Sequence, residues 1–359
     1  MTAQEPAPLS NSTLSYTQIQ VLAEVYISSL SLSLIGSGSV IVVSLIKKRC
    51  VDDQVRPLFQ LALADFLAAA VLLSTSVINI LPGETLFLSY KFCEYSIPLA
   101  YCFYSISFLL VMVYSYEAKE AVSGWRESSE PDEQSHSNLR SRKETLYLLY
   151  FLAWAIPGLF MVTVVIPLRN SPAAIIPVQG WTDLKRESVA SDNAFYCTSC
   201  ILLMQKSDIC HSPVWYEDLE NALFFLYVLG VLTCCTVVYC KVKKWYHRQQ
   251  EECLFLVEGD GFSRRHLRGM YCTARSIVLV VFICWTPAFV LVILSFNMSQ
   301  KRLFALYVIQ ALTMSLQGFF NSIVYGWLRR NFRDVALGES VGLLTQNRRA
   351  FYDESLTIT

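Results

Sequence analysis

The chain has 359 residues, of which 54% are hydrophobic and 16% are charged, and its formal net charge at pH 7 is zero. The charged fraction is well below the roughly 25% typical of soluble proteins, and the apolar residues form long blocks rather than amphipathic stripes. These features exclude a soluble globular domain and predict a multi-pass membrane protein in contact with the lipid bilayer. We expect no nucleic-acid partner.

Seven apolar segments follow one another along the chain. Each is long enough to cross a bilayer core about 30 Å thick at 1.5 Å of helix rise per residue. They are 25–46, 58–81, 95–116, 145–168, 221–240, 276–298 and 303–328. The expected fold is therefore all-α, a polytopic seven-helix transmembrane bundle. The first 20 residues contain no Lys or Arg, so they lack the basic region of a cleavable signal peptide.

The basic residues are distributed unevenly between the two sides of the membrane that seven spans define. Most of the 29 Lys and Arg residues fall after the first, third, fifth and seventh spans. Because positively charged loops stay in the cytoplasm, we expect the N-terminus outside and the C-terminus inside, most simply at the plasma membrane. Of the two outer glycosylation sequons, at Asn11 and Asn297, only Asn11 lies far enough from the membrane for us to expect glycosylation.

The cysteines also sort by side. Four of them lie in the expected outer regions, at Cys93, Cys197, Cys200 and Cys210. An even number in an oxidising space predicts disulfides, with three pairings open. Zinc is the alternative for the Cys-x-x-Cys pair 197/200, but no second pair accompanies it, so a disulfide is favoured. The expected cytoplasmic cysteines are Cys50, Cys240 and Cys253, and those in or beside the spans, including Cys234 and Cys272, are expected to be small packing residues.

One acidic residue stands inside the second span. Asp65 is the single charge in the Leu- and Ala-rich run from 58 to about 81. A central Asp costs about 2.5–3.5 kcal/mol on insertion scales, so it must face a polar cavity or a partner. It is either a structural hydrogen-bonding group or the centre of polar residues whose packing changes in a switch. Ser107, Gln317 and Asn321 project from the third and seventh spans at its depth, and Trp285 lies beside them.

Four motifs stand in order along the chain and on the appropriate side of the membrane. They are Leu-Ala-Leu-Ala-Asp at 61–65, Cys-Trp-Thr-Pro at 284–287, Asn-Ser-Ile-Val-Tyr at 321–325 and Asn-Phe-Arg at 331–333. They resemble the signatures of the second, sixth, seventh and eighth helices of rhodopsin-like G-protein-coupled receptors. Trp154 is similar to the family's fourth-helix tryptophan. The resemblance covers residues 35 to about 337 and implies a short amphipathic eighth helix that begins near Asn331.

The resemblance implies roles for particular residues. The switch residues would be Asp65, Ser107, Trp285, Pro287, Gln317, Asn321 and Tyr325, with Pro287 kinking the sixth helix. It also implies a sodium ion at Asp65, Ser107 and Asn321, for which a water-filled hydrogen-bond network is the equal alternative. Cys93 stands at the family's disulfide position, so it would pair with Cys197, Cys200 or Cys210.

A ligand pocket is expected between the third, sixth and seventh spans. Ala100 occupies the site where amine receptors carry an Asp, so the unknown ligand is not expected to be a biogenic amine. An aromatic, largely uncharged pocket would be lined by Tyr101, Tyr104, Phe289, Tyr307 and Gln310. Ordinary helix packing is the equal alternative for these side chains.

The sequence also departs from the family. Ser39 replaces the first-helix Asn, Val231 stands near the usual fifth-helix proline, and Glu117-Ala118-Lys119 replaces the Asp-Arg-Tyr of the third helix. A lysine is not the geometric equal of the missing arginine, so coupling to a G protein is left open.

We predict a non-enzymatic receptor-like protein in which a ligand biases movement of the sixth and seventh helices toward cytoplasmic partners. The alternatives are a non-signalling scaffold or trafficking protein and, less favoured, a transporter, because the spans contain one clear charge. All four histidines lie in loops, which disfavours a membrane zinc hydrolase. The predicted organisation is an outer tail at 1–20, the bundle with its eighth helix at 21–337 and a cytoplasmic tail at 338–359.

Overall fold

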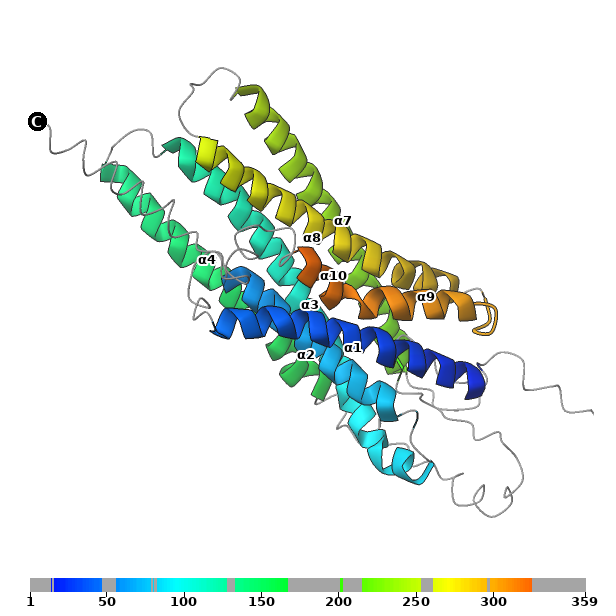
Figure 1. Cartoon of the computed structure of the whole chain (residues 1–359). Helices are drawn as coiled ribbons and strands as arrows, with labels where there is room; N and C mark the ends of the chain where they lie inside the picture. The colour runs from blue at the N-terminus through cyan, green and yellow to red at the C-terminus, as the bar shows by residue number, and fades with distance from the viewer. Residues whose placement is uncertain are drawn as a thin grey trace, which may run out of the picture.

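The structure is a computed structural model, in which the helices form one elongated bundle (Figure 1). It describes residues 14, 16–46, 56–78, 80, 83–127, 133–166, 201–202, 215–252, 261–295 and 298–324. Among these residues there are helices and turns but no strand, which confirms the expected helical class.

The described helices begin and end as follows: α1 (Tyr16–Ile46), α2 (Arg56–Ile78), α3 (Gly83–Glu127), α4 (Glu133–Phe160), α7 (Trp215–Glu252), α8 (Gly261–Ser295), α9 (Phe304–Ser315) and α10 (Gln317–Ser322). Element η1 (Met161–Val165) is a π-helical turn that continues α4. It follows Pro157, whose missing N–H interrupts the regular pattern of α-helical hydrogen bonds. Helices α3, α4, α7 and α8 continue well beyond the predicted apolar segments. The prediction that the histidines lie in loops is therefore wrong for His136, His247 and His266, which lie on α4, α7 and α8.

Five stretches of the described helices are long and apolar enough to cross a membrane. They are Thr17–Ile46, Arg56–Ile78, Tyr95–Glu117, Glu144–Thr163 and Cys272–Ser295. A shorter apolar stretch, Phe225–Lys241, lies in α7. The predicted seventh span is divided at Leu316 (φ −80°, ψ 0°), which separates α9 from α10. A multi-pass membrane protein is thus confirmed, while the count of seven spans stays a prediction.

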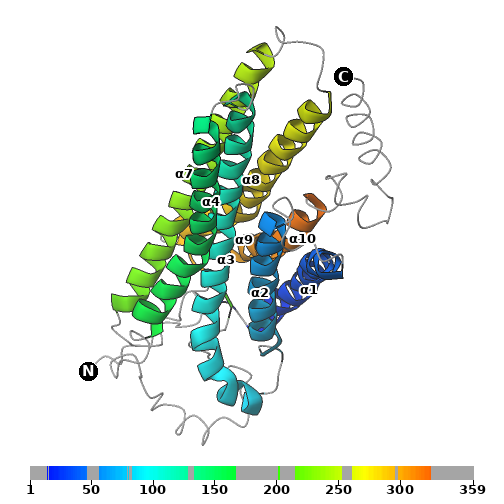
Figure 2. The same cartoon turned by 90° about the vertical axis from the view of Figure 1, so that its left-hand side faces the viewer.

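Helix α3 lies at the centre of the bundle (Figure 2). It contacts α2, α4, α7 and α8, so most of the other helices are arranged around it. Helix α1 packs on α2 and also on α9 and α10, which brings the beginning of the described chain against its end. The bundle is therefore closed between its first and last helices, and the polar residues of α2, α3 and α10 face one interior.

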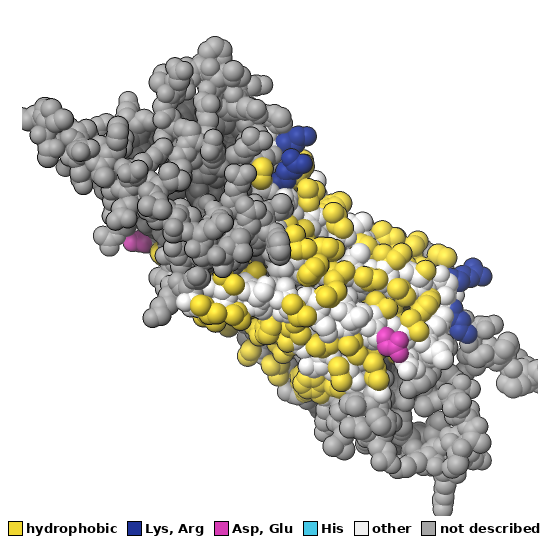
Figure 3. All heavy atoms as spheres, in the orientation of Figure 1, with side chains coloured by type: hydrophobic (Ala, Val, Ile, Leu, Met, Phe, Trp, Pro, Cys, Tyr) yellow, Lys and Arg dark blue, Asp and Glu magenta, His cyan; other side chains and the backbone are white. Residues whose placement is uncertain are grey.

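The outer surface of the bundle is apolar. Ile35 is 69% exposed, Phe151 67% and Ile283 60%, on three different helices. On the face shown in Figure 3, hydrophobic side chains cover the middle of the described surface and Lys and Arg side chains lie toward its two ends. Apolar side chains at these positions are stable against lipid tails and not against water, which agrees with a bilayer as the surroundings.

Small residues allow α1 and α10 to approach closely. A Cβ atom added at Gly36 would stand 2.6 Å from Ser322 Oγ and 3.1 Å from the Cα of Phe319. One added at Gly318 would collide with Ser33 Oγ and stand 3.2 Å from the Cβ of Asp65. Small residues at such spacing are typical of tightly packed membrane helices. This contact holds α10 directly against the part of α2 that carries the buried acid.

Candidate functional site

The site is built around the buried face of α2. Its Leu- and Ala-rich sequence favours a helix, and every third or fourth residue on one side is buried, from Leu58 to Ser76. Asp65 lies on this face and is 3% exposed. Its neighbours on the face include Ala62, Ala64, Ala68 and Ala69, whose short side chains leave room for groups from other helices to reach the carboxylate.

Three uncharged side chains donate hydrogen bonds to Asp65. Ser107 Oγ and Gln317 Nε2 donate to Oδ1 at 2.7 and 3.1 Å. Asn321 Nδ2 donates to Oδ2 at 2.7 Å. The three donors are at most 1% exposed, so these bonds lie away from solvent. The prediction that polar residues of the third and seventh spans meet at Asp65 agrees with this geometry.

The division of the seventh segment at Leu316 places two of these donors. Gln317 and Asn321 are four residues apart on α10, so they lie one helical turn apart on the same face. Gln317 Nε2 also donates to Ser107 Oγ at 3.1 Å, which ties α10 to α3 as well as to α2.

Trp285 connects α8 to this network. Its indole Nε1 donates to Gln317 Oε1 at 2.6 Å, and its side chain is 1% exposed. Gln317 thus accepts from Trp285 with its oxygen and donates to Asp65 with its nitrogen. A continuous chain of hydrogen bonds therefore joins α8 to α10 and α2, and we call Asp65, Ser107, Trp285, Gln317 and Asn321 the polar core.

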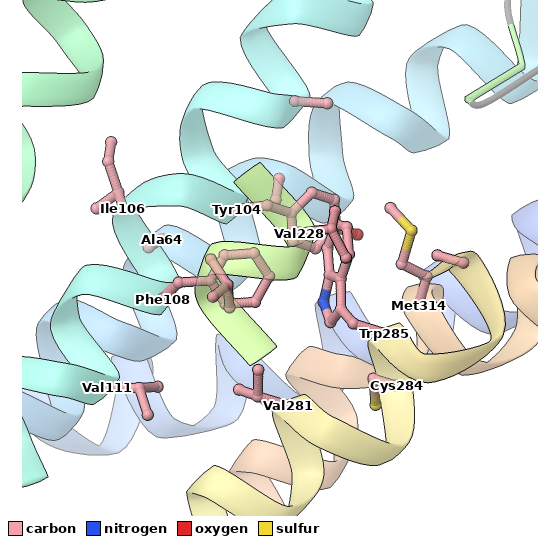
Figure 4. Packing of buried hydrophobic residues seen from close by; sticks show 14 of the residues in the cluster. Ala64, Tyr104, Ile106, Phe108, Val111, Val228, Val281, Cys284, Trp285 and Met314 are labelled. Atoms are coloured by element: carbon pink, nitrogen blue, oxygen red, sulfur yellow. The ribbon is translucent and has the colours of Figure 1, made fainter. Parts of the chain in front are cut away.

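The polar core is covered by aromatic packing. The ring of Trp285 meets Tyr104 and Phe108 edge-on, with centroid distances of 5.2 and 4.8 Å, and lies among side chains of α3, α7 and α9 in Figure 4. Phe108 is also 6.0 Å from Tyr227 on α7. Edge-to-face pairs of this kind each add about 0.5–1.5 kcal/mol beyond simple burial, so the orientation of Trp285 is fixed by both packing and hydrogen bonding.

The five residues of the expected ligand pocket lie on α3, α8 and α9. Tyr104, Tyr307 and Gln310 are buried, while Tyr101 and Phe289 are half-buried. Tyr104 packs on Trp285 and Phe289 stacks on Phe225 of α7 at 5.4 Å, so the two aromatics have different neighbours. The pocket itself stays a prediction.

Sequence reasoning missed a partner of Gln310. Its Nε2 donates to Tyr26 Oη at 3.1 Å, and the Tyr26 hydroxyl is 3.3 Å from Gln310 Oε1. Tyr26 lies on α1 and is 2% exposed. The available signal was a tyrosine within the first apolar segment, spaced three or four residues from Leu22, Ser29 and Leu30, which are buried on the same helix.

A second polar contact joins α3 to α4 near the end of the third span. Tyr150 Oη donates to Glu117 Oε2 at 2.5 Å. In the same region Arg56 of α2 lies over the ring of Tyr147, 4.4 Å from its centroid. The sequence marks Glu117 by its position in the third-helix motif, but it does not indicate that Tyr150 is its partner.

The comparison of Ser39 with the first-helix Asn of the receptor family is not supported by its position. Ser39 lies on the exposed side of α1, and its hydroxyl donates to the Gly36 carbonyl of its own helix at 2.6 Å. The α1 residue that approaches the polar core is Ser33, beside Gly318. Ser33 and Ser39 are six residues apart, and that spacing turns them to different sides of a helix with 3.6 residues per turn.

The remaining predicted residues are placed as follows. Pro287 lies inside α8, which continues to Ser295. Tyr325, Asn11, the eighth helix and the outer cysteines Cys197, Cys200 and Cys210 lie outside the described residues, as does the side chain of Cys93. The disulfide and the glycosylation therefore stay predictions.

The family relationship comes from the sequence as a whole. The family model described as Transmembrane protein 116 matches residues 19–348, which includes most of α1, the polar core and all the described helices that follow. The match begins three residues after the start of α1 and covers well over half of the chain. The chain therefore belongs to the transmembrane protein 116 family.

Proposed function

We propose that this protein is a receptor-like seven-helix membrane protein, oriented with its N-terminus outside at the plasma membrane. A ligand on the outer side would bias the movement of α8 relative to α9 and α10, and cytoplasmic partners would read that movement. The proposal rests on one observation above all, the buried hydrogen-bond chain from Trp285 through Gln317 to Asp65.

A switch at this site would operate through the Trp285–Gln317 bond, which is the hydrogen bond between α8 and α10 in the polar core. A buried N–H left without a partner costs about 1–3 kcal/mol, so intermediate positions of α8 relative to α10 are disfavoured. Two arrangements would then exist, one with the Trp285–Gln317 bond and one in which the two groups have other partners. A ligand shifts such an equilibrium by the difference between its affinities for the two arrangements.

The rhodopsin-like resemblance supports this interpretation at the level of the site. Asp65, Trp285 and Asn321 come from three of its motifs, far apart in sequence, and belong to one hydrogen-bonded group. We further propose that the protein couples to a G protein and that it has no enzymatic activity.

The polar core also suits the sodium ion that the resemblance implies. The side chains of Asp65, Ser107 and Asn321 carry oxygen atoms, the ligand type that hard cations prefer. Asn321 Oδ1 is buried and has no hydrogen-bond partner among the described residues, so an oxygen is available beside the carboxylate. Asp65, Ser107 and Asn321 would hold the ion, which would balance the charge of the carboxylate. A water-filled network remains the alternative.

A specific observation favours the second candidate, a receptor-fold protein that does not signal. Glu117 accepts a hydrogen bond from Tyr150, and the next residue, Ala118, has no group that could engage a G protein as the family's arginine does. In this case the polar core would hold the bundle together, and the cytoplasmic surface would serve scaffolding or trafficking.

The experiment is G-protein recruitment in cells, measured for the parent chain and for Asp65→Asn and Ala118→Arg at matched surface levels. Receptor function predicts that Ala118→Arg raises recruitment, because it supplies the planar donor group of the family. Asp65→Asn should change the sodium dependence of the signal while the protein still reaches the surface. The matched control is Glu24→Gln, which neutralises an exposed carboxylate on α1 outside the polar core.

Silence of the parent and both variants with every G protein would overturn the signalling proposal and favour the scaffold. A change of equal size in Glu24→Gln would show that the effect of Asp65→Asn does not come from the polar core.

A further inference from the structure

Two cysteines on neighbouring helices lie at the edge of the apolar part of the bundle. Cys240 on α7 and Cys272 on α8 are both exposed. Cys240 is the last residue of the predicted span 221–240 and lies within the apolar stretch Phe225–Lys241, and Cys272 lies four residues before the predicted span 276–298. The other described cysteines differ, because Cys102, Cys235 and Cys284 are buried and Cys234 is exposed farther inside its stretch.

The packing of α7 on α8 places these two thiols at the same depth. The helices are consecutive and in contact, and Phe225 of α7 stacks on Phe289 of α8 at 5.4 Å. Cys240 follows Phe225 by 15 residues and Cys272 precedes Phe289 by 17, so their heights along antiparallel helices differ by about 3 Å. Beyond them, α7 continues to Glu252 and α8 extends back to Gly261.

Basic side chains mark this depth as the level of the lipid headgroups. Lys241, Lys243 and Lys244 follow Cys240 and are exposed, and Arg275, one turn from Cys272, is exposed as well. Lysine and arginine at the end of a membrane helix extend toward anionic headgroups. The thiols therefore lie where an acyl chain attached to sulfur could enter the bilayer directly, and juxtamembrane cysteines are typical acceptors of such chains.

We propose that Cys240 and Cys272 are sites of S-acylation by long-chain fatty acyl groups. The cysteine thiolate attacks the thioester carbonyl of a long-chain acyl-coenzyme A, delivered by a membrane acyltransferase. A new carbon–sulfur bond forms, the bond to coenzyme A breaks, and coenzyme A leaves as its thiol with the proton that the cysteine gave up. No oxidant or reductant is required.

The proposal rests on the orientation assigned under the proposed function, because acyl-coenzyme A is a cytoplasmic substrate. Acylation at these two positions would also affect the proposed movement of α8. Two acyl chains would attach the cytoplasmic ends of α7 and α8 to the lipid and resist displacement of α8, the helix that carries Trp285.

The test counts acylated thiols on the full-length chain expressed in cells. Free thiols are blocked, thioesters are cleaved with hydroxylamine, and the released thiols are tagged with a polyethylene-glycol maleimide that adds a visible mass. Cys240→Ser and Cys272→Ser should each remove one hydroxylamine-dependent tag, and the double variant should remove two. Cys234→Ser is the matched control and should remove none, because its exposed thiol lies deeper in the apolar stretch.

A double variant that keeps the tag number of the parent would overturn the proposal, provided that it elutes from gel filtration at the parental position. Cys240→Ala and Cys272→Ala should lose the same number of hydroxylamine-dependent tags as the serine variants, which excludes an effect of the serine hydroxyl. A membrane-impermeant maleimide on intact cells separates the two proposals. Labelling of Cys240 from outside would overturn the orientation and the acylation together, whereas an unlabelled thiol with an unchanged tag count overturns the acylation alone.

Discussion

The hydrogen bond between Trp285 Nε1 and Gln317 Oε1 can be tested by a double-mutant cycle. Trp285→Phe removes the donor and keeps an aromatic ring, while Gln317→Met removes the acceptor and keeps the side-chain length. Gln317→Met also removes the two bonds that Nε2 donates to Asp65 and Ser107, but this loss is common to the single and the double variant and cancels in the cycle. Each single variant leaves the other partner buried without its hydrogen bond, and the double variant leaves neither. The double variant should therefore cost less free energy of unfolding than the sum of the two single variants.

The expected size of this difference follows from the geometry. The bond is 2.6 Å long and both side chains are 1% exposed, so neither group can turn to water after its partner is removed. An orphaned buried polar group costs about 1–3 kcal/mol. Coupling energies of hydrogen bonds between membrane helices average about 0.6 kcal/mol and reach about 1.7 kcal/mol. We expect about 1–1.5 kcal/mol, since this bond is short and fully buried.

The assay is reversible unfolding of the purified protein in mixed micelles titrated with sodium dodecyl sulfate, followed by helical circular dichroism. Gln317→Met combined with Tyr150→Phe provides the control pair. Tyr150 bonds to Glu117, which is ten residues beyond Ser107 on α3 and hence about 15 Å farther along the helix. Sites separated by this distance should be additive within about 0.3–0.5 kcal/mol.

A coupling energy between Trp285 and Gln317 no larger than that of the control pair would refute the argument. It would mean that the two groups find other partners at no cost, and a switch based on breaking this bond would lose its energetic basis.

Three further predictions concern packing, the second polar contact and topology. Gly318→Ala should lower the free energy of unfolding by about 1–3 kcal/mol because its Cβ would overlap α1, whereas Gly230→Ala, with no heavy atom within 4 Å, should raise it by up to about 1 kcal/mol. The reverse order in the same micelle titration would contradict the close packing of α1 on α10. Tyr150→Phe should lower the free energy of unfolding by about 1–3 kcal/mol, because the hydrogen bond to the Glu117 carboxylate is lost. An unchanged free energy of unfolding would show that this hydrogen bond does not stabilise the protein. An epitope before Met1 should bind antibody on intact cells and one after Thr359 only after permeabilisation; antibody binding to the second without permeabilisation would invert the topology.

The residues of the polar core could be predicted because the membrane penalises a lone acid. An Asp in an apolar span requires polar partners, and Ser, Gln and Asn side chains at the matching depth of other spans are the candidates. Asp65, Ser107, Gln317 and Asn321 were found by this reasoning, and the structure joins them with bonds of 2.7–3.1 Å. The sequence does not give the order of these bonds. Only the three-dimensional structure shows that Gln317 lies between Trp285 and Asp65.

Contacts that depend on helix rotation could not be predicted in the same way. Ser33 and Ser39 are both serines in one apolar helix, and only the packing of α1 on α10 shows which of them faces the interior. The Tyr26–Gln310 pair and the Tyr150–Glu117 pair join residues that are distant in sequence and chemically ordinary. A single sequence can place such a tyrosine on a buried helix face, but it does not say which partner the tyrosine has, because many tyrosines could reach many polar groups.

The sequence by itself determined that this protein lies in a membrane, where its apolar spans occur and which acid must be buried. These properties follow from the cost of placing polar groups in lipid, which acts on each segment independently of its neighbours. Only the tertiary structure decided that the last predicted span divides at Leu316, that Gly318 admits α1 and that Trp285 reaches Asp65 through Gln317. Those features depend on how helices rotate and approach one another, and that is settled by packing between helices and not by the hydropathy of any one of them.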